Sequence, residues 1–362
     1  MKKADYFLIS AVAVLLLLGV VVITSVSAAL SQEKLGSPNT FLFHHLLFGL
    51  LPGVILGFLA YKIKLSLLKK WIPALLFLNL FLLVLVFVPI IGITLGGASS
   101  WINLGITSFQ PSEALKLIFI LYLASWLSSR MEKTKKEFNE TLLAFSAIMS
   151  LIALLLILQP DIGTLGIIMS TGLLMYFLAG TPLKHAGFIV LVALAGLTAL
   201  IKLAPYRLNR FLSFINPDID PMGISYQIKQ AFIAIGSGGI LGTGLGMSVQ
   251  RFGFLPQPMA DSIFASFAEE TGFLGSLTMI SFFLIFVWLG FSIAKKAKDN
   301  FLKLTALGIT GWLALQTFVN IGSMVGLLPL TGVPLPFISY GGSALVTELI
   351  GIGILLNISK RQ

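Results

Sequence analysis

Long apolar runs dominate this chain, and short polar or basic stretches separate them. A helix needs about 20 mainly apolar residues to cross a hydrocarbon core of about 30 Å. Ten runs reach or approach that length, at about residues 7–29, 45–61, 72–91, 112–129, 142–158, 163–179, 185–203, 264–294, 304–327 and 344–358. The pattern predicts an all-α polytopic membrane protein with about ten transmembrane helices, forming a single domain over residues 1–362.

Composition supports the same class of protein. Hydrophobic residues make up 57% of the chain and charged residues only 10%, against about 25% charged residues in soluble domains. The first run follows Lys2 and Lys3 and ends in SVSAA, a sequence that resembles a signal-peptide cleavage site. Because the run is longer than the roughly 7–15 apolar residues of a signal peptide, we expect a retained first span.

Basic residues indicate the orientation of the spans. With the N-terminus inside, most of the 24 Lys and Arg residues fall in segments on the cytoplasmic side. The positive-inside rule therefore predicts that both termini are cytoplasmic. Attraction to anionic inner-leaflet lipid explains the net charge of +10, so we expect no nucleic-acid partner.

The outer segments carry the helix-breaking residues. A loop of about 60 residues, 204–263, joins spans 7 and 8 and is too long to be an idle connector. Within it, AFIAIGSGGILG predicts a short re-entrant or interfacial helix broken by Gly236, Gly238 and Gly239. The cytoplasmic connections are short, so any chemistry faces outward. We expect the loop and the breaker-rich segments 96–113, 159–163 and 329–343 to roof one outward cavity.

Three carboxylates lie at or within the eighth apolar run. Asp261 follows Pro256 and Pro258 and falls in the predicted first turn of span 8, where it is either a helix cap or a functional acid. Glu269 lies about 12 Å deeper along the helix, and Glu270 faces nearly opposite Asp261. A carboxylate at that depth costs a few kcal/mol, so it normally faces a partner or a wet cavity.

Glu113 and Lys116 are spaced i, i+3 on one face of span 4, where they can pair. The pair is either structural, or Lys116 points its ammonium group at a phosphate in the outer cavity. Arg207 and Arg210 are basic residues on the outer side. They either snorkel at the interface or bind substrate.

The remaining ionisable candidates lie near span ends. Asp161 is a candidate cap of span 6, and Glu348, about five residues into span 10, is a candidate buried partner for a base of the outer loop. His44, His45 and His185 are scattered without zinc-binding spacing, so we interpret them as interfacial.

Five segments together resemble, in order and spacing, the SEDS family of bacterial cell-wall polymerases, over essentially the whole chain. They are SFQPSEALK, QPDIGT, FINPDIDPMGISYQIKQAFIAIGSGGILGTGLGMSVQ, LPQPMADSIFASFAEETGFLG and PLTGVPLPFISYGGS. The shorter stretches GLGMSVQ, ADSIFA and TGVPLPFISYGGS resemble the division branch of the family (FtsW) more than its elongation branch (RodA).

The resemblance implies a peptidoglycan glycosyltransferase that polymerises lipid II at the outer face of the bacterial cytoplasmic membrane. It implies a ten-span fold, and a class B penicillin-binding protein as the partner that supplies the transpeptidase. The family's essential aspartate, in the outer loop before span 8, corresponds to Asp261. By motif position the resemblance also implies roles for Glu113, Lys116, Arg210, Glu269 and Glu270. We add Asp161, Arg207, Lys229 and Glu348 to the candidate substrate-binding residues.

Two stretches depart from the family pattern. The family commonly shows GARRWI where this chain has Ser99 and Ser100 before Trp101, so two expected basic residues are absent. It commonly shows LPEAHTD where residues 255–261 read LPQPMAD. The loss of that Glu, His and Thr weakens any role for the neighbours of Asp261 in assisting it or binding metal.

The expected mechanism is one inverting displacement, in which Asp261 acts as general base on the 4-hydroxyl of the acceptor sugar. Lys116, Arg210 and a divalent cation, Mg or Mn with unknown ligands, are candidates for stabilising the leaving pyrophosphate. Two alternatives use the same features. A flippase or transporter of lipid-linked precursors needs alternating access, and a non-catalytic scaffold uses the outer loops only for contact.

Overall fold

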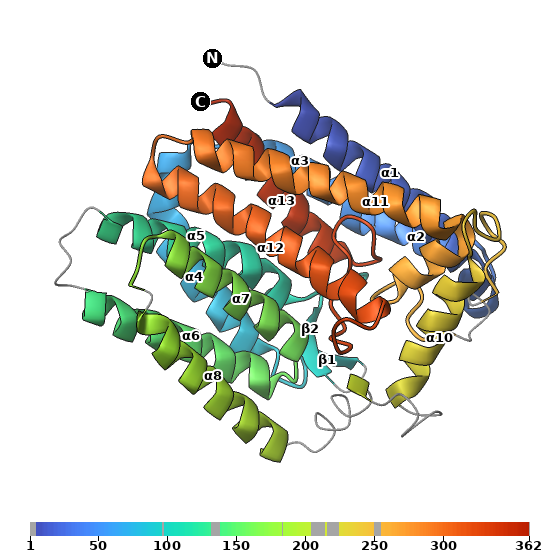
Figure 1. Ribbon diagram of the computed structural model, residues 1–362, viewed down its shortest axis with the longest axis horizontal. Coiled ribbons are helices and arrows are strands. Elements are labelled where there is room, and N and C mark those ends of the chain that lie inside the picture. The colour runs from blue at the N-terminus through green and yellow to red at the C-terminus, as the bar shows by residue number, and fades with distance from the viewer. Residues whose placement is uncertain are drawn as a thin grey trace.

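The chain folds into a nearly all-helical bundle with one small sheet (Figure 1). The computed structural model describes residues 5–95, 98–131, 138–182, 184–203, 214–215, 224–249 and 255–361. Its elements are α1 (Tyr6–Leu35), α2 (Thr40–His45), the π-helix η1 (Leu46–Leu50), α3 (Leu51–Lys62), α4 (Leu65–Leu85), β1 (Gly92–Leu95), β2 (Ala98–Asn103), β3 (Ser108–Phe109), α5 (Pro111–Met131), α6 (Phe138–Leu158), α7 (Ile162–Leu178), α8 (Lys184–Leu203), α10 (Ile224–Ser237), α11 (Ile263–Lys296), α12 (Asn300–Met324) and α13 (Gly342–Ser359).

The ten predicted apolar runs all coincide with helical segments. Among the described residues, eight helical segments are long and apolar enough to cross a membrane: Tyr6–Leu35, Thr40–Lys62, Leu65–Leu85, Pro111–Met131, Glu140–Leu158, Ile263–Lys296, Asn300–Met324 and Gly342–Ser359. The runs 163–179 and 185–203 form α7, which is 17 residues long, and α8. The nearly all-helical membrane fold is confirmed, whereas the count of ten spans stays a prediction.

Three helices form the interior of the bundle. The most apolar windows of α5, α12 and α13 are 56%, 67% and 78% buried, against 22% for the Thr40–Lys62 and Leu65–Leu85 segments. The outer helices expose large apolar side chains such as Phe43 and Phe77, as expected of surfaces that face lipid. The inner helices hold most of the buried polar residues described below.

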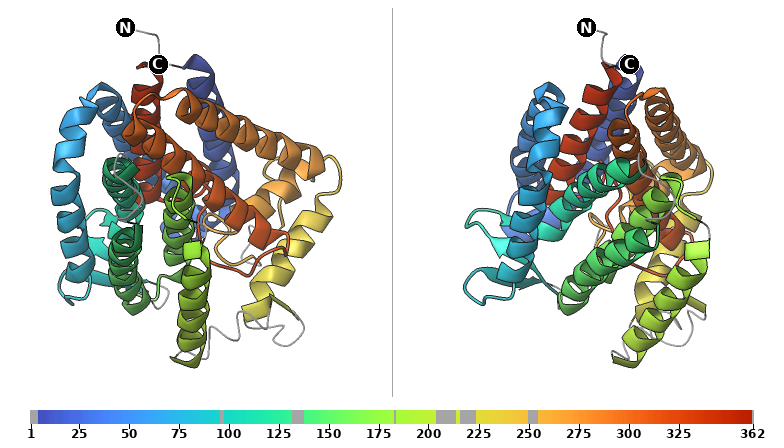
Figure 2. Two further views of the ribbon diagram at one scale, coloured as in Figure 1. Left: turned by 60° about the vertical axis from the view of Figure 1, so that its left-hand side comes forward. Right: turned by 90° about the vertical axis from the view of Figure 1, so that its left-hand side faces the viewer.

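The start of α1 and the end of α13 lie at one end of the bundle (Figure 2). The backbone N–H of Asp5 donates to Ser359 Oγ at 3.3 Å, and Lys360 Nζ donates to the Tyr61 carbonyl at 2.8 Å. Lys62 Nζ lies 5.9 Å from the centre of the same Tyr61 ring. Basic residues that the charge pattern assigns to the cytoplasmic side therefore gather at the end of the bundle that carries the termini.

A three-stranded antiparallel sheet in the order β1-β2-β3 precedes α5, and the sequence pattern did not predict it. Gly92 pairs with Ile102 in the first ladder, and Ile102 pairs with Phe109 in the second. The strands contain 4, 6 and 2 residues, which is too short for a clear alternating pattern. The sheet leads the chain directly into Pro111, the first residue of α5.

Helix α11 is broken at Gly272, although the apolar run 264–294 predicted one continuous span. Gly272 has φ 65° and ψ −163°. The loop that follows α10 pairs with the backbone groups that the break frees. Thr243 N–H donates to the Glu269 carbonyl at 2.9 Å, and Phe273 N–H donates to the Gly239 carbonyl at 2.9 Å. Unpaired backbone groups are costly within a membrane, so the loop makes the break possible.

Helix α10 contains most of the short helix predicted within AFIAIGSGGILG, and it ends at Ser237, before the glycine pair. A Cβ atom on Gly238 would lie 2.2 Å from the Ala268 carbonyl oxygen, so only glycine lets the loop approach α11 this closely. The predicted helix and its break are confirmed, with Gly236 still inside the helix.

Candidate active site

Asp261 lies just before α11 and is half-buried. The prediction that it falls in the first turn is wrong, because the helix begins at Ile263 with Ser262 as its N-cap. Tertiary bonds explain the later start. Ser339 Oγ donates to the Ala260 carbonyl at 2.6 Å, and Asn320 Nδ2 donates to the Asp261 carbonyl at 2.8 Å. These bonds engage carbonyls that an earlier helix start would direct along the helix axis.

A glutamine from α10 contacts the Asp261 carboxylate. Gln227 Nε2 donates to Asp261 Oδ2 at 3.2 Å and to Ser262 Oγ at 2.8 Å. Gln227 therefore offers this carboxylate a neutral amide donor.

The segment 333–340 supports the stretch that carries Asp261. Tyr340 N–H donates to the Met259 carbonyl at 2.8 Å, and Leu335 N–H donates to Ser339 Oγ at 2.8 Å. The Tyr340 hydroxyl lies 2.9 Å from Nδ1 of His44, which the sequence interpretation placed at the interface. Burial raises the pKa of Tyr340, so its hydroxyl stays neutral.

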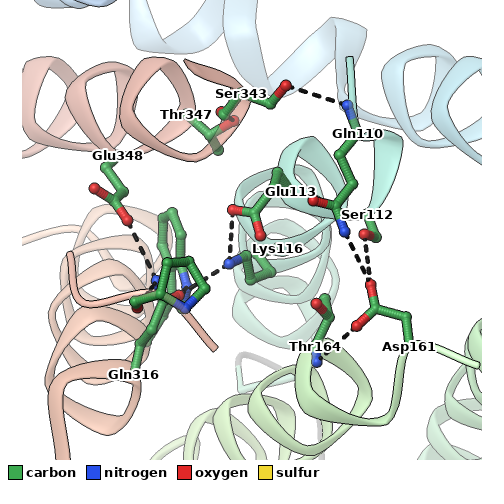
Figure 3. A network of polar contacts seen from close by, with 12 residues as sticks. Gln110, Ser112, Glu113, Lys116, Asp161, Thr164, Gln316, Ser343, Thr347 and Glu348 are labelled. Atoms are coloured by element: carbon green, nitrogen blue, oxygen red, sulfur yellow. Dashed lines mark hydrogen bonds and ion pairs between the residues drawn. The ribbon is translucent and has the colours of Figure 1, made fainter. Parts of the chain in front are cut away.

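Glu113 and Lys116 form the predicted ion pair, with Lys116 Nζ 2.8 Å from Glu113 Oε2 (Figure 3). Lys116 Nζ also donates to Gln316 Oε1 at 2.9 Å, and the Trp312 indole N–H donates to the same oxygen at 2.8 Å. All four side chains are buried in the centre of the bundle. The ammonium group is therefore directed at neighbouring helices, and this geometry supports the structural interpretation of the pair.

Glu348 of α13 joins the same cluster. Its carboxylate accepts from the Phe337 N–H at 2.8 Å and from Gln316 Nε2 at 3.3 Å. Gln316 Nε2 also donates to the Pro334 carbonyl at 3.0 Å. The predicted partner of Glu348 was a base of the outer loop. Arg207 and Arg210 lie outside the described residues, so that pairing stays a prediction.

Asp161 is the N-cap of α7, as the cap interpretation predicted. Its Oδ1 accepts from the Thr164 N–H at 3.2 Å. Its Oδ2 accepts from Ser112 Oγ at 2.8 Å and from Gln110 Nε2 at 3.3 Å, which ties α7 to the start of α5 (Figure 3). The Gln110 N–H donates to Ser343 Oγ at 3.1 Å. The breaker-rich segments around residues 110, 161 and 343 therefore meet, as expected.

Glu269 and Glu270 are both buried, and both have polar partners. The Glu269 carboxylate accepts from Ser248 Oγ and, at 3.1 Å, from the Val249 N–H, which anchors the loop after α10. The Glu270 carboxylate accepts from Ser25 Oγ of α1 at 2.5 Å. These contacts satisfy the need of a deep carboxylate for a partner. A role for either residue in substrate binding stays a prediction.

Three other residues named from the sequence lie on α10, α8 and α2. Lys229 is on α10, two residues beyond Gln227. His185 Nδ1 lies 2.8 Å from the Tyr176 hydroxyl, and His45 is buried in α2. Within the described ranges, no group of three or more His, Asp or Glu side chains is placed to hold a metal ion. The predicted divalent cation stays a prediction.

The sequence interpretation missed four residues that organise this region: Gln227, Gln316, Asn320 and Ser339. Gln316 and Asn320 are 0% and 1% exposed, in the middle of the apolar run 304–327. Polar residues inside a span are expensive unless they hydrogen-bond within the bundle. Their position in that run was a signal that could have marked them.

Comparison with known proteins gives consistent matches over the whole chain. A family model described as cell cycle protein, covering FtsW, RodA and SpoVE, matches residues 6–362. The chain is 38% identical over 356 residues to stage V sporulation protein E of Bacillus subtilis, covering 98% of this chain and 97% of that protein. It is 37% identical over 348 residues to the probable peptidoglycan glycosyltransferase FtsW of Coxiella burnetii, covering 95% and 93%.

Solved structures show the same fold. A chain from a peptidoglycan synthase complex, described as coordinating polymerization and crosslinking, superposes with a TM-score of 0.80 at 28% identity, covering 98% of this chain and 97% of that one. The rod shape determining protein RodA of Thermus thermophilus superposes with a TM-score of 0.72 at 27% identity, covering 98% and 96%.

Proposed function

Because this chain belongs to the FtsW, RodA and SpoVE family of cell cycle proteins, we propose that it is a peptidoglycan glycosyltransferase of cell division. It is an integral membrane protein, as its apolar helices and its family indicate. It polymerises lipid II into glycan strands, with Asp261 as general base. Several relatives at similar identity are named peptidoglycan glycosyltransferase FtsW, which supports the activity.

The exposure of the candidate carboxylates supports the assignment of Asp261. Glu113, Glu269 and Glu348 are buried within the bundle. Asp161 caps a helix and accepts from two further side chains. Asp261 is partly exposed, with its Oδ1 atom buried, next to residues 262–270 of α11, which are all buried. A base that meets a bulky lipid-linked sugar must be reachable, so Asp261 is the best candidate of the set.

The chemistry needs one carboxylate. The acceptor sugar's 4-hydroxyl oxygen attacks the anomeric carbon of the donor while the Asp261 carboxylate takes the hydroxyl proton. The bond from that carbon to undecaprenyl pyrophosphate breaks, and the pyrophosphate leaves with the electron pair. The lipid-linked sugar is α and the polymer is β, so a single inverting displacement is sufficient.

The leaving pyrophosphate gathers negative charge near the membrane surface. Arg207, Arg210 and Lys229 of the outer loop are the proposed stabilising residues, because Lys116 is already engaged by Glu113 and Gln316. A cation brought by the pyrophosphate itself would add to that stabilisation. No step of the proposed mechanism passes through a metal ion held by the protein.

The charge pattern and the comparisons also support a proposed orientation and partner. The end of the bundle with both termini faces the cytoplasm, where its Lys residues meet anionic lipid. Asp261 then faces outward, at the outer surface of the bacterial inner membrane. The similarity to a chain of a peptidoglycan synthase complex supports a class B penicillin-binding protein as the crosslinking partner.

The decisive experiment is polymerisation of purified lipid II by the protein, with and without its partner, read out on gels. We expect polymer from the parent and none from Asp261→Asn, which keeps the shape of the side chain but removes the base. Asp299→Asn is the matched control, since it changes an exposed acid that caps α12, where asparagine caps equally well, and we expect it to keep activity.

Polymer formation unaffected by Asp261→Asn would exclude Asp261 as the base. Movement of lipid II across vesicle membranes without any polymer would favour the transporter alternative. If neither polymer formation nor lipid II movement is detected while partner binding is intact, the scaffold alternative would be favoured.

A further inference from the structure

Helix α12 carries two buried amide side chains one helical turn apart. Gln316 contacts the ion pair of Lys116 and Glu113 through Lys116 Nζ. Asn320 lies one turn nearer the C-terminal end of α12, and its Nδ2 donates to two backbone carbonyls, those of Asp261 and Val333, each at 2.8 Å. The Asn320 amide thus connects the backbone of Asp261, the proposed base, to the segment 333–340.

The two amides hydrogen-bond to adjacent residues of that segment. Gln316 Nε2 donates to the Pro334 carbonyl at 3.0 Å, next to the Val333 carbonyl bound by Asn320. The segment 333–340 in turn holds the carbonyls of Met259 and Ala260 through Tyr340 N–H and Ser339 Oγ. Three consecutive carbonyls, 259 to 261, are therefore fixed directly or indirectly to α12.

The Asn320 side chain also carries one buried oxygen that is unfavourable for stability. Its Oδ1 is buried and has no hydrogen-bond partner among the described residues. A buried acceptor without a partner is unfavourable, so an apolar side chain would be the simpler choice for a residue that only fills space. The two hydrogen bonds that Nδ2 donates offset this unfavourable burial.

We propose that Asn320 is a positioning residue for Asp261. By fixing the Asp261 backbone to the rigid centre of the bundle, Asn320 holds the carboxylate within reach of the acceptor sugar. This inference rests on the proposed function of Asp261. Asn320 does not touch the carboxylate and takes no part in proton transfer. Its hydrogen bonds determine the position of the carboxylate, and small displacements of a reacting group lower the reaction rate strongly.

The chain contains a matched control at the opposite end. Asn357 of α13 is 0% exposed, and its Nδ2 also donates to two backbone carbonyls, those of Ala60 and Ile63, at 3.0 and 2.7 Å. Replacing either asparagine by leucine keeps a similar volume and removes both Nδ2 bonds, and in Asn357→Leu the 3.4 Å bond from Arg361 Nε to Asn357 Oδ1 is lost as well. The two variants therefore share the loss of two bonds to backbone carbonyls and differ in which backbone segment they release.

The experiment compares Asn320→Leu and Asn357→Leu in the partner-bound protein. We expect Asn320→Leu to lower kcat by roughly 10- to 100-fold with KM for lipid II unchanged, and to speed amide hydrogen exchange over residues 255–262. Asn357→Leu should lower the melting temperature similarly while keeping kcat and the exchange rate of that segment. Ser339→Ala, which removes the bond to Ala260, should lower kcat in the same direction if Asn320→Leu fails to fold.

Parent-like kcat in Asn320→Leu would overturn the proposal, and so would equal losses of kcat in both asparagine variants. If the parent itself makes no polymer, the proposed function fails. The exchange measurement then still tests whether Asn320 holds the Asp261 segment, since faster exchange in Asn320→Leu alone supports that tie.

Discussion

The buried ion pair of α5 offers a sharp test between two roles for Lys116. Lys116→Met keeps a long apolar side chain but leaves the Glu113 carboxylate in the centre of the bundle without its 2.8 Å ammonium partner. Glu113→Gln together with Lys116→Met removes both charges. In both variants Gln316 Oε1 keeps the indole N–H of Trp312 as a donor, and Glu348 keeps its donors Phe337 N–H and Gln316 Nε2. The comparison between the two variants therefore isolates the charge of Glu113.

The structure sets the size of the effect. Two unit charges at 2.8 Å attract by ~6 kcal/mol at an effective dielectric constant of about 20. Part of this offsets the cost of burying the charges. Removing one member of a buried pair typically costs about 3–5 kcal/mol, whereas replacing both by neutral groups of similar shape is often close to neutral. We therefore expect Lys116→Met to be strongly destabilised and the double variant to recover most of the stability.

The assay pairs unfolding of the detergent-solubilised protein with lipid II polymerisation. If the pair is structural, activity follows stability, so the double variant regains polymer formation. A double variant that is as stable as the parent but makes no polymer would refute this reasoning. That result would instead mean that the ammonium of Lys116 contacts the substrate.

Three further changes test other parts of the site. Gln227→Glu puts a second carboxylate beside Asp261, which disfavours two negative charges, so the acidic limb of the kcat/KM profile should move to higher pH; no movement, or a shift to lower pH, would contradict the contact. Glu269→Ala removes the acceptor for Ser248 and Val249 and should speed proteolysis within residues 243–249, whereas the exposed control Glu33→Ala should not. Gly272→Ala puts a side chain on a residue with φ 65° and places its Cβ 2.4 Å from Gly242 N, so it should lower the free energy of unfolding by about 2–5 kcal/mol. Gly166→Ala, whose Cβ would meet no atom within 4 Å, should change that free energy little.

Much of the fold could be predicted, because a membrane demands long apolar helices and leaves few alternatives. All ten runs coincide with helices. The sheet was missed because its strands are too short to show a period. The break in α11 was missed because the run remains apolar on both sides of Gly272. What allows the break is a loop some 30 residues earlier, and no local pattern near Gly272 encodes that pairing.

The site was predicted in part for the same reason. Acids and bases within apolar runs are conspicuous, so Asp261, Glu113 and Lys116 could be named from the sequence. Their partners could not, because they come from distant elements. Lys116 and Gln316 are 200 residues apart in the chain. The start of α11 was placed too early because bonds from Asn320 and Ser339 to backbone carbonyls compete with the helical pattern there.

The division between buried and accessible charge suggests why this site needs its amides. The centre of the bundle can keep Glu113 and Lys116 only as partners of each other, so it offers rigidity but no reachable base. The surface offers a reachable acid, but residues outside helices are normally more mobile than the helices they connect. A base must be both reachable and well placed. Amide donors from α10 and α12 serve the second demand, because they tie the Asp261 segment to the bundle.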